Sequence, residues 1–346
     1  MLNVERLLLH NELAQLIRET IRARGPQPFA WFMQQALYHP EHGYYASGRA
    51  AIGRHGDYFT NVSVGPLFGQ LLTVQFAEIW ERLGNSDNFA VLEQGADDGA
   101  FARDVLECAR QRFLKFFAAF RYRIVEPFPA LQDRQSQTLK AFADKVDWAK
   151  SVTAFVGVHF SNELLDALPI NLRGKRVGLA SDELVFVECV DEPETKLNQA
   201  VLEWVDDVAT NLQHGVVIAI DYGVNRSAFR ESLQVRAKHR YLTSPFQQIG
   251  HADLTMHVNW TDIAERAAAK GLHIAGFTDQ HHFLTGILSE FPELCDTAKA
   301  KRELQTLLHP EMLGRAFQVL ALSKGVDADR LCGFKFARDP NAALEL

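Results

Sequence analysis

The stretch Ala90-Val-Leu-Glu-Gln-Gly-Ala-Asp-Asp-Gly-Ala-Phe-Ala-Arg-Asp-Val-Leu106 decides the fold. An apolar run ends on the acid Glu93, a turn with Gly95 and Gly99 follows, and helical periodicity begins near Phe101. A strand, a glycine turn and a helix in this order form a nucleotide-type binding site at the carboxyl edge of a parallel sheet. Glycine lets the backbone approach a ligand closely, and the helix N-terminus offers unpaired N–H groups. Such a turn also occurs as a plain tight connection, so neighbouring residues decide whether it binds a ligand and which one.

Acidic residues narrow the class of ligand. Residues 122–126 read as a second strand that ends on Glu126, and a carboxylate there commonly accepts hydrogen bonds from both hydroxyls of a ribose. Asp97 and Asp98 lie inside the glycine turn, where like charges would repel a pyrophosphate. They suit a ligand with a cationic amino-acid end. The pattern therefore favours S-adenosylmethionine (SAM), which carries an ammonium, a sulfonium and a ribose but no phosphate.

Composition excludes several classes of protein. The 346 residues are 47% hydrophobic and 23% charged, as is ordinary for a globular protein. The net charge of −7 argues against nucleic acid or an anionic membrane as a partner, and no apolar run reaches the length of a membrane span. The four cysteines lack C-x-x-C spacing, which with the acids of the N-terminal segment predicts reduced thiols and a cytoplasmic location. The histidines show no metal-binding spacing, so we expect no metal.

Alternating strands and helices predict the organisation of the chain. We expect a doubly wound, mostly parallel α/β sheet in a SAM-binding domain over residues 85–325. A helical and loop region over 1–84 would pack on this domain, and residues 326–346 would form a tail. Residues 171–190 read as an antiparallel pair, which places an insertion at 171–214. A long aromatic loop near Asp57 is a candidate active-site loop, although its aromatic side chains could equally pack the N-terminal helices.

A second polar cluster, Asn162-Glu163-x-x-Asp166, follows a buried strand predicted over 153–160. Acids three residues apart would share one face of a helical turn. The carboxyl edge of an open α/β sheet is where ligands bind, and three other predicted strands also end on acids there. The alternative is a simple helix start, with Asn162 as the cap and Glu163 favourable to the helix dipole.

Motifs spread over residues 28–324 resemble the MidA-like SAM-dependent methyltransferase family, which includes a mitochondrial assembly factor for respiratory complex I. In chain order they include Tyr38-His-Pro-x-x-Gly-Tyr-Tyr45, Gly56-Asp-Tyr-Phe-Thr60, Glu93-x-Gly-x-x-x-Gly99, Ile124-Val-Glu-Pro-x-Pro129, Ser161-Asn-Glu-Leu-Leu-Asp-Ala-Leu-Pro169, Ile220-Asp-Tyr-Gly223 and Gln280-x-x-Phe-Leu284. The resemblance implies a class I methyltransferase fold, with a seven-stranded sheet in which one strand is antiparallel.

The resemblance also implies methyl transfer from SAM to a protein side chain, with arginine favoured as the acceptor. We expect Glu163, Asp166 and Asp57 to be catalytic. The expected cofactor-binding residues are Glu93, Gly95, Ala96, Asp97, Gly99, Glu126, Pro127, Asn162 and Thr60. Two alternatives stay open: methylation of a small molecule, with Asp57 and His159 as acid–base groups, or a binding protein that keeps the fold without turnover. A homodimer is also open.

Two departures from the family pattern bear on these expectations. Asp97 stands where the family usually has a third glycine, and Asn61-Val-Ser63 stands where Ser-Pro-Glu is usual. The first departure is compatible with SAM, because Asp97 could face the ammonium of the ligand. The second removes an acid from the candidate active-site loop, and it bears on the substrate rather than on the cofactor.

Overall fold

The computed structural model describes residues 12–48, 50, 60–189 and 197–346. The chain forms two compact units, each built from three segments. One comprises Met1–Phe59, Ala167–Glu203 and Glu231–Met256, and the larger one comprises Thr60–Asp166, Trp204–Arg230 and His257–Leu346. The predicted boundaries at residues 84 and 326 stay predictions.

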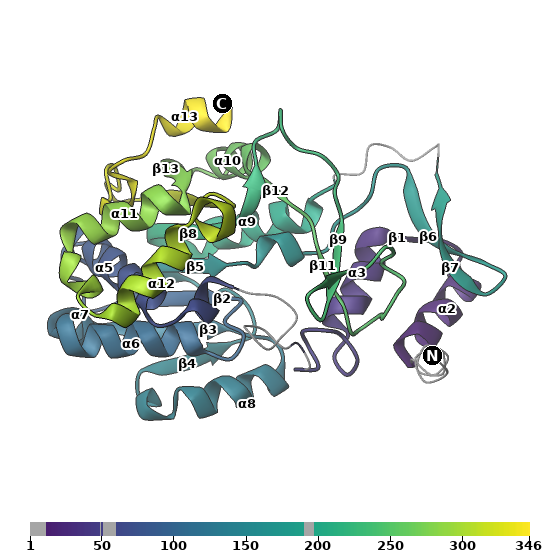
Figure 1. The fold of residues 1–346 in the computed structure, drawn as a ribbon, viewed down its shortest axis with the longest axis horizontal. Coiled ribbons are helices and arrows are strands. Elements are labelled where there is room, and N and C mark those ends of the chain that lie inside the picture. Colours follow the sequence, from purple (N-terminus) through teal and green to yellow (C-terminus); the bar gives the residue numbers. More distant parts are fainter. Residues whose placement is uncertain (1–11, 49, 51–59, 190–196) are drawn as a thin grey trace. The chain divides into compact units, whose positions relative to one another are not determined.

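The larger unit contains a sheet with the strand order β13-β14-β8-β5-β2-β3-β4 (Figure 1). All neighbours in this order are parallel except β14, which is antiparallel to β8 and β13. The predicted sheet with one antiparallel strand is therefore confirmed, and the short strand β12 pairs with β8 in addition. The strands are β2 Phe89–Gln94, β3 Phe120–Val125, β4 Val146–Ala149, β5 Phe155–Asn162, β8 Leu212–Val224, β12 Val258–Asn259, β13 His273–Asp279 and β14 Phe317–Lys324.

Helices precede, connect and follow these strands. The α-helices are α4 Asn61–Val64, α5 Leu67–Arg82, α6 Ala100–Arg112, α7 Leu114–Ala119, α8 Pro129–Thr138, α9 Gln199–Asn211, α10 Trp260–Ala269, α11 Gln280–Glu290, α12 Ala298–Leu308 and α13 Pro340–Leu344. The boundary between the two units falls inside α9. Shorter turns are the 3₁₀-helices η1 Lys140–Phe142, η2 Leu165–Ala167, η3 Pro292–Cys295 and η5 Cys332–Phe334, and the π-helix η4 Pro310–Gly314.

Adjacent residues of β5 show how helices cover both faces of this sheet. Phe160 stacks on Phe101 of α6 at 4.4 Å between ring centroids and meets Phe76 of α5 edge-on at 5.6 Å. His159 points to the opposite face, where its ring lies 5.5 Å from that of Trp204 on α9. Successive side chains of a strand alternate between faces, so α5 and α6 cover one face and α9 covers the other.

Among its described residues, the smaller unit contains two short antiparallel sheets and the helices α2 Glu12–Arg24 and α3 Phe29–Tyr38. One sheet joins β1 Gln27–Pro28, β6 Lys175–Ala180 and β7 Glu183–Glu188, which confirms the antiparallel pair predicted over 171–190. The other joins β10 Arg240–Tyr241, β9 Gln234–Ala237 and β11 Asp253–Thr255. Tyr45 packs on Tyr38 at 5.7 Å, and its hydroxyl donates to Asp253 at 2.6 Å. These contacts give Tyr45 a packing role within this unit.

Candidate functional site

The turn after β2 is built from backbone conformations that favour glycine. Gly95, Asp97 and Gly99 have φ angles of 86°, 43° and 81°. The left-handed region is costly for most side chains, but aspartate visits it more readily than other residues do. Asp97 therefore keeps the backbone shape of the glycine that it replaces and adds a carboxylate. Asp98 has a structural task, because its side chain accepts a hydrogen bond from the Ala100 N–H at 2.9 Å where α6 begins.

Carboxylates are crowded around this turn. Burial and the neighbouring Asp98 raise the pKa of Asp97 to about 6, although Arg134 lies 3.7 Å from it and opposes the shift. Burial raises the pKa of Glu93 to about 8, against a 2.7 Å hydrogen bond from the Tyr122 hydroxyl. A cationic ligand group would relieve this concentration of acid, whereas a phosphate would add to it. Ala96 is also buried in the turn.

The second strand ends on a buried carboxylate with two hydrogen-bond donors. The side chain of Glu126 accepts from the Phe128 N–H at 3.0 Å and from the Gln135 side chain at 3.1 Å. Burial raises the pKa of Glu126. A carboxylate has about four acceptor sites, so two donors leave capacity for the hydroxyls of a ribose. Pro127 follows directly and is exposed.

Gln135 of α8 is a site residue that sequence reasoning missed. Its side chain is fully buried, and its Nε2 donates both to the Asp97 carbonyl at 3.0 Å and to the Glu126 carboxylate. Its Oε1 accepts from the Trp148 indole at 2.9 Å. Gln135 thus joins the glycine turn to the acid at the end of β3. The only available signal was a glutamine within a polar helix, which no motif singles out.

The backbone of Glu163 is in the left-handed conformation. Its φ is 55°, its N–H donates to the Ile220 carbonyl at 2.9 Å, and the next helical turn begins at Leu165. Glu163 and Asp166 therefore do not share the face of one helical turn, and that prediction is wrong. The alternative of a helix start at Glu163 is wrong for the same reason.

Asp221 at the end of β8 fixes the turn after Glu163. Its buried carboxylate accepts hydrogen bonds from the N–H groups of Leu165 at 2.7 Å, Asp166 at 3.3 Å and Tyr222 at 2.7 Å. Burial raises the pKa of Asp221 to about 7, and these backbone donors oppose the shift. Asp166 itself is buried. The Asp221 carboxylate thus stabilises the backbone of the segment that follows the neighbouring strand β5.

The departure at residues 61–63 preserves a helix cap. The Thr60 hydroxyl accepts from the Ser63 N–H at 3.2 Å, and the Ser63 hydroxyl accepts from the Thr60 N–H at 2.9 Å. This reciprocal pair is a capping box, in which the third helical residue is usually Glu or Gln. Ser63 therefore completes the helix cap although it is not an acid. Asp57 lies outside the described residues.

One main-chain N–H and one amide side chain donate to the Glu163 carboxylate. Its Oε1 accepts from the Asn61 N–H at 3.0 Å and from the Asn162 side chain at 2.8 Å. Asn61 is fully buried, and its Nδ2 donates to the Asn162 side-chain oxygen at 2.9 Å. Gln280 of α11 donates in turn to the Asn61 side-chain oxygen at 2.8 Å. Glu163 and Asn162 are thus brought together, and Asn61 joins them from a distant part of the sequence.

His159 lies in a different environment. It is fully buried, and burial lowers its pKa to about 3, so its ring is neutral near pH 7. Its Nε2 lies 3.3 Å from the Gln94 side-chain oxygen, which also accepts from the Trp204 indole at 3.0 Å. These contacts indicate a packing role beneath α9 rather than an acid–base role.

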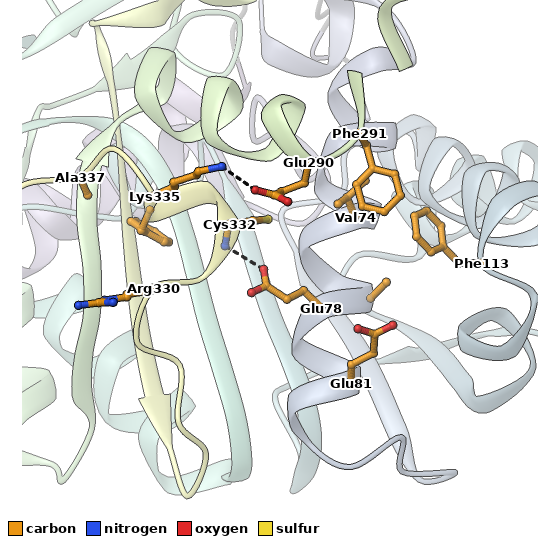
Figure 2. Close-up of a pocket in the computed structure, with 12 residues that line it drawn as sticks. Val74, Glu78, Glu81, Phe113, Glu290, Phe291, Arg330, Cys332, Lys335 and Ala337 are labelled. Carbon is orange, nitrogen blue, oxygen red and sulfur yellow. Dashed lines mark hydrogen bonds and ion pairs between the residues drawn. The ribbon is translucent and has the colours of Figure 1, made fainter. Parts of the chain in front are cut away.

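A cavity of about 730 Å³ lies between α5, the end of α11 and the segment 330–337 (Figure 2). Lys335 pairs with Glu290 at its rim at 2.7 Å, and the Cys332 N–H donates to Glu78 at 2.9 Å. None of its lining residues belongs to the predicted site. In the described part of the chain, no cluster of His, Cys, Asp or Glu could hold a metal ion. None of the described helices combines the length and apolarity that crossing a bilayer requires.

Comparison with known proteins identifies the family. Residues 71–185 and 183–278 match a family model described as "Putative S-adenosyl-L-methionine-dependent methyltransferase". The chain is 25% identical to the mitochondrial protein arginine methyltransferase NDUFAF7 homolog of Drosophila melanogaster, over 93% of this chain and 87% of that protein. Human NDUFAF7 is 25% identical over 92% of this chain and 84% of its own length. A Burkholderia thailandensis crystal structure bound to S-adenosyl-homocysteine is 27% identical, with a TM-score of 0.85 over 97% of both chains.

These comparisons also correct one prediction. The curated relatives are named as mitochondrial proteins, so the prediction of a cytoplasmic location is wrong. Reduced, scattered cysteines indicate a reducing environment but do not distinguish one such compartment from another. The match to the family model covers more than half of the sequence, and the Burkholderia structure extends the likeness over nearly all of it. The chain therefore belongs to this family of SAM-dependent methyltransferases.

Proposed function

We propose that this methyltransferase transfers a methyl group from SAM to an arginine side chain of a protein. The curated relatives support the substrate class, because they are named protein arginine methyltransferases. The acidic character of the site supports it as well, since a guanidinium is cationic under all ordinary conditions. The net charge of −7 is compatible with a basic protein segment as a partner.

The cofactor supplies an electrophilic methyl group when it is bound, and the residues at the ends of β2 and β3 fit it. Glu126 would accept hydrogen bonds from the ribose hydroxyls, for which its carboxylate has capacity beside Phe128 and Gln135. Asp97 and Glu93 would face the cationic end, which would favour the charged forms that burial disfavours in both groups. Further contacts are assigned to Gly95, Ala96, Gly99, Pro127, Asn162 and Thr60.

The observation that carries the proposal is the conformation of Glu163. A non-glycine residue in the left-handed region costs about 1 kcal/mol or more, and such strain clusters at functional sites. Here the strained backbone is tied to Ile220, and the carboxylate is held by N–H donors from Asn61 and Asn162. A carboxylate fixed in this way at a strand end is suited to orient a planar guanidinium.

Transfer would form a bond between the methyl carbon and a guanidinium nitrogen and would break the bond between that carbon and the sulfur of SAM, which would leave as S-adenosylhomocysteine. The guanidinium nitrogen would lose one proton. In the proposal, Glu163 orients the nitrogen and Asp166 accepts the proton. The backbone of Asp166 is fixed because its N–H and that of Leu165 donate to the Asp221 carboxylate. Asp57 stays a third candidate.

The test compares Glu163→Gln with Glu81→Gln, a charge-neutralising control in the cavity of Figure 2. Transfer of labelled methyl from SAM would be measured into a lysate of cells that lack this chain, and the modified side chains would be identified by mass spectrometry. We expect Glu163→Gln to transfer methyl about 10²-fold more slowly, with S-adenosylhomocysteine affinity by calorimetry nearly unchanged. The control should keep the wild-type rate.

Two results would refute the proposal in different ways. Label found only in small molecules would exclude a protein substrate. A Glu163→Gln variant that melts at a lower temperature but transfers methyl at the wild-type rate would show that Glu163 stabilises the turn and does not act on the acceptor.

A further inference from the structure

We infer that Gln280 is a positioning residue for methyl transfer, which acts on Glu163 through a directional chain of side-chain amides. The chain runs from Gln280 on α11 through Asn61 on α4 and Asn162 on β5 to the Glu163 carboxylate. Its three links measure 2.8, 2.9 and 2.8 Å. We call these four residues the amide relay. This inference rests on the proposed role of Glu163.

The direction of the relay is fixed at both ends. Gln280 Nε2 also donates to the Leu307 carbonyl at 3.1 Å, and a carbonyl can only accept. The amide nitrogen of Gln280 therefore faces Asn61 too, which must present its oxygen to Gln280 and its nitrogen to Asn162. Asn162 then presents its own nitrogen to the Glu163 carboxylate, which also only accepts when it is ionised.

Burial makes this arrangement costly to disturb. Asn61 and Gln280 are both fully buried, so a rotated amide could not exchange its lost partner for water. Gln280 Oε1 has no hydrogen-bond partner among the described residues, and a buried acceptor without a partner costs about 1–3 kcal/mol. The glutamine therefore contributes less to stability than its burial suggests, as expected of a group retained for function.

The helix start does not require the Gln280 side chain. Asp279 caps α11 by accepting a hydrogen bond from the His282 N–H at 2.8 Å. Gln280 is thus free of the capping task, and its amide is directed at Asn61 and Leu307. Asn61 stands where the family pattern has serine, whose hydroxyl is too short to bridge the same partners. In this inference, Asn61 therefore serves to link Gln280 to Asn162.

The experiment removes the amide of Gln280 and compares it with a matched control. Gln280→Met keeps the length and apolar stem of the side chain but removes its donors. Gln75→Met makes the same change at another fully buried glutamine, which bonds to Glu78 and to the Gly333 N–H on α5 and η5. Four variants would be compared: Gln280→Met, Gln75→Met, Glu163→Gln and the double variant Gln280→Met/Glu163→Gln. For each, we would measure the melting temperature, the S-adenosylhomocysteine affinity and the rate of labelled-methyl transfer into the lysate.

We expect both methionine variants to melt lower, and only Gln280→Met to transfer methyl about tenfold or more slowly per folded molecule. Its S-adenosylhomocysteine affinity should stay within about threefold of wild type, because the partners of the Gln280 amide, Asn61 and Leu307, are not assigned to the cofactor. The double variant should be no slower than Glu163→Gln alone, since the relay acts through that carboxylate. If Gln280→Met does not fold, Asn61→Leu breaks the same relay and should show the same loss.

Two outcomes would overturn the inference. If Gln280→Met or Asn61→Leu matches the rate of Gln75→Met while Glu163→Gln is slow, the relay is structural and the proposed role of Glu163 stands. If Glu163→Gln itself retains the wild-type rate, the proposed role of Glu163 fails, and the relay has no catalytic group to position.

Discussion

Replacing Glu93 by glutamine should make the protein more stable at neutral pH. Burial raises the pKa of Glu93 from 4.5 to about 8, so folding disfavours its charged form. One pKa unit corresponds to about 1.4 kcal/mol of folding stability. The full shift therefore destabilises the fold by about 5 kcal/mol once the pH exceeds the pKa values of both the unfolded and the folded state. At pH 7 the folded carboxyl is still mostly protonated while the unfolded one is ionised, which makes the cost about 3 kcal/mol.

The sign of the pH dependence follows from the raised pKa. The cost is absent well below pH 4.5, grows as the unfolded carboxyl ionises, and levels off above pH 8. Glu93→Gln removes the titration and keeps an oxygen that can accept from the Tyr122 hydroxyl, which lies 2.7 Å from Glu93. The stability difference between variant and wild type should therefore widen by about 3 kcal/mol between pH 5 and pH 8.

Urea denaturation at a series of pH values, followed by circular dichroism, would measure this difference. Glu107→Gln on α6 is the control, because Glu107 is only partly buried. A constant difference across the pH range would refute the argument, since it would mean that Glu93 has the same proton affinity in the folded and unfolded states. A Glu93→Gln variant that is less stable at pH 7 would refute it as well.

Three further predictions concern the cofactor site. SAM should bind more tightly as the pH rises through about 6, and its binding should release protons, because its cationic end favours the charged form of Asp97. Calorimetry in two buffers of different ionisation enthalpy would detect the proton release, and proton uptake on binding would contradict this prediction. Gln135→Met should weaken S-adenosylhomocysteine binding about tenfold, and less than additively with Glu126→Ala; full additivity in titration calorimetry would show that the two residues act independently. Asp97→Gly should raise the free energy of unfolding by about 1 kcal/mol, because glycine relieves the left-handed backbone strain at this position. If urea denaturation gives the variant a lower free energy of unfolding than the wild type, the ion pair between Asp97 and Arg134 outweighs the strain.

Local patterns in the sequence predicted the sheet and the ligand-binding turn. The strand, the turn at Gly95 and Gly99 and the helix α6 follow from residues close together in the chain, so their periodicity and glycines were sufficient. The alternation of strands and helices then restricted the topology to a doubly wound sheet. The resemblance supplied the antiparallel strand, which β14 confirms.

Long-range contacts explain what the sequence did not reveal. Gln280 and Asn61 are 219 positions apart, and Gln135 and the Asp97 carbonyl are 38 apart, so no local pattern links them. The three-residue spacing of Glu163 and Asp166 predicted a helical turn, and no local signal indicated the left-handed conformation of Glu163. Tertiary contacts hold it there, since its N–H bonds to Ile220. Local propensity yields to tertiary context at such positions.

The place of β14 in the sheet has a consequence for protein synthesis. β14, residues Phe317–Lys324, pairs with both β8 and β13, and it is the last strand of the sheet to leave the ribosome. Until then, the long apolar strand β8 lacks its neighbour on that side, and an unpaired apolar edge invites pairing with other chains. The nascent protein is therefore most vulnerable to aggregation late in translation, when most of the site residues have already emerged. Messages truncated before the codon for Phe317 should yield products that depend on chaperones rather than a smaller working enzyme.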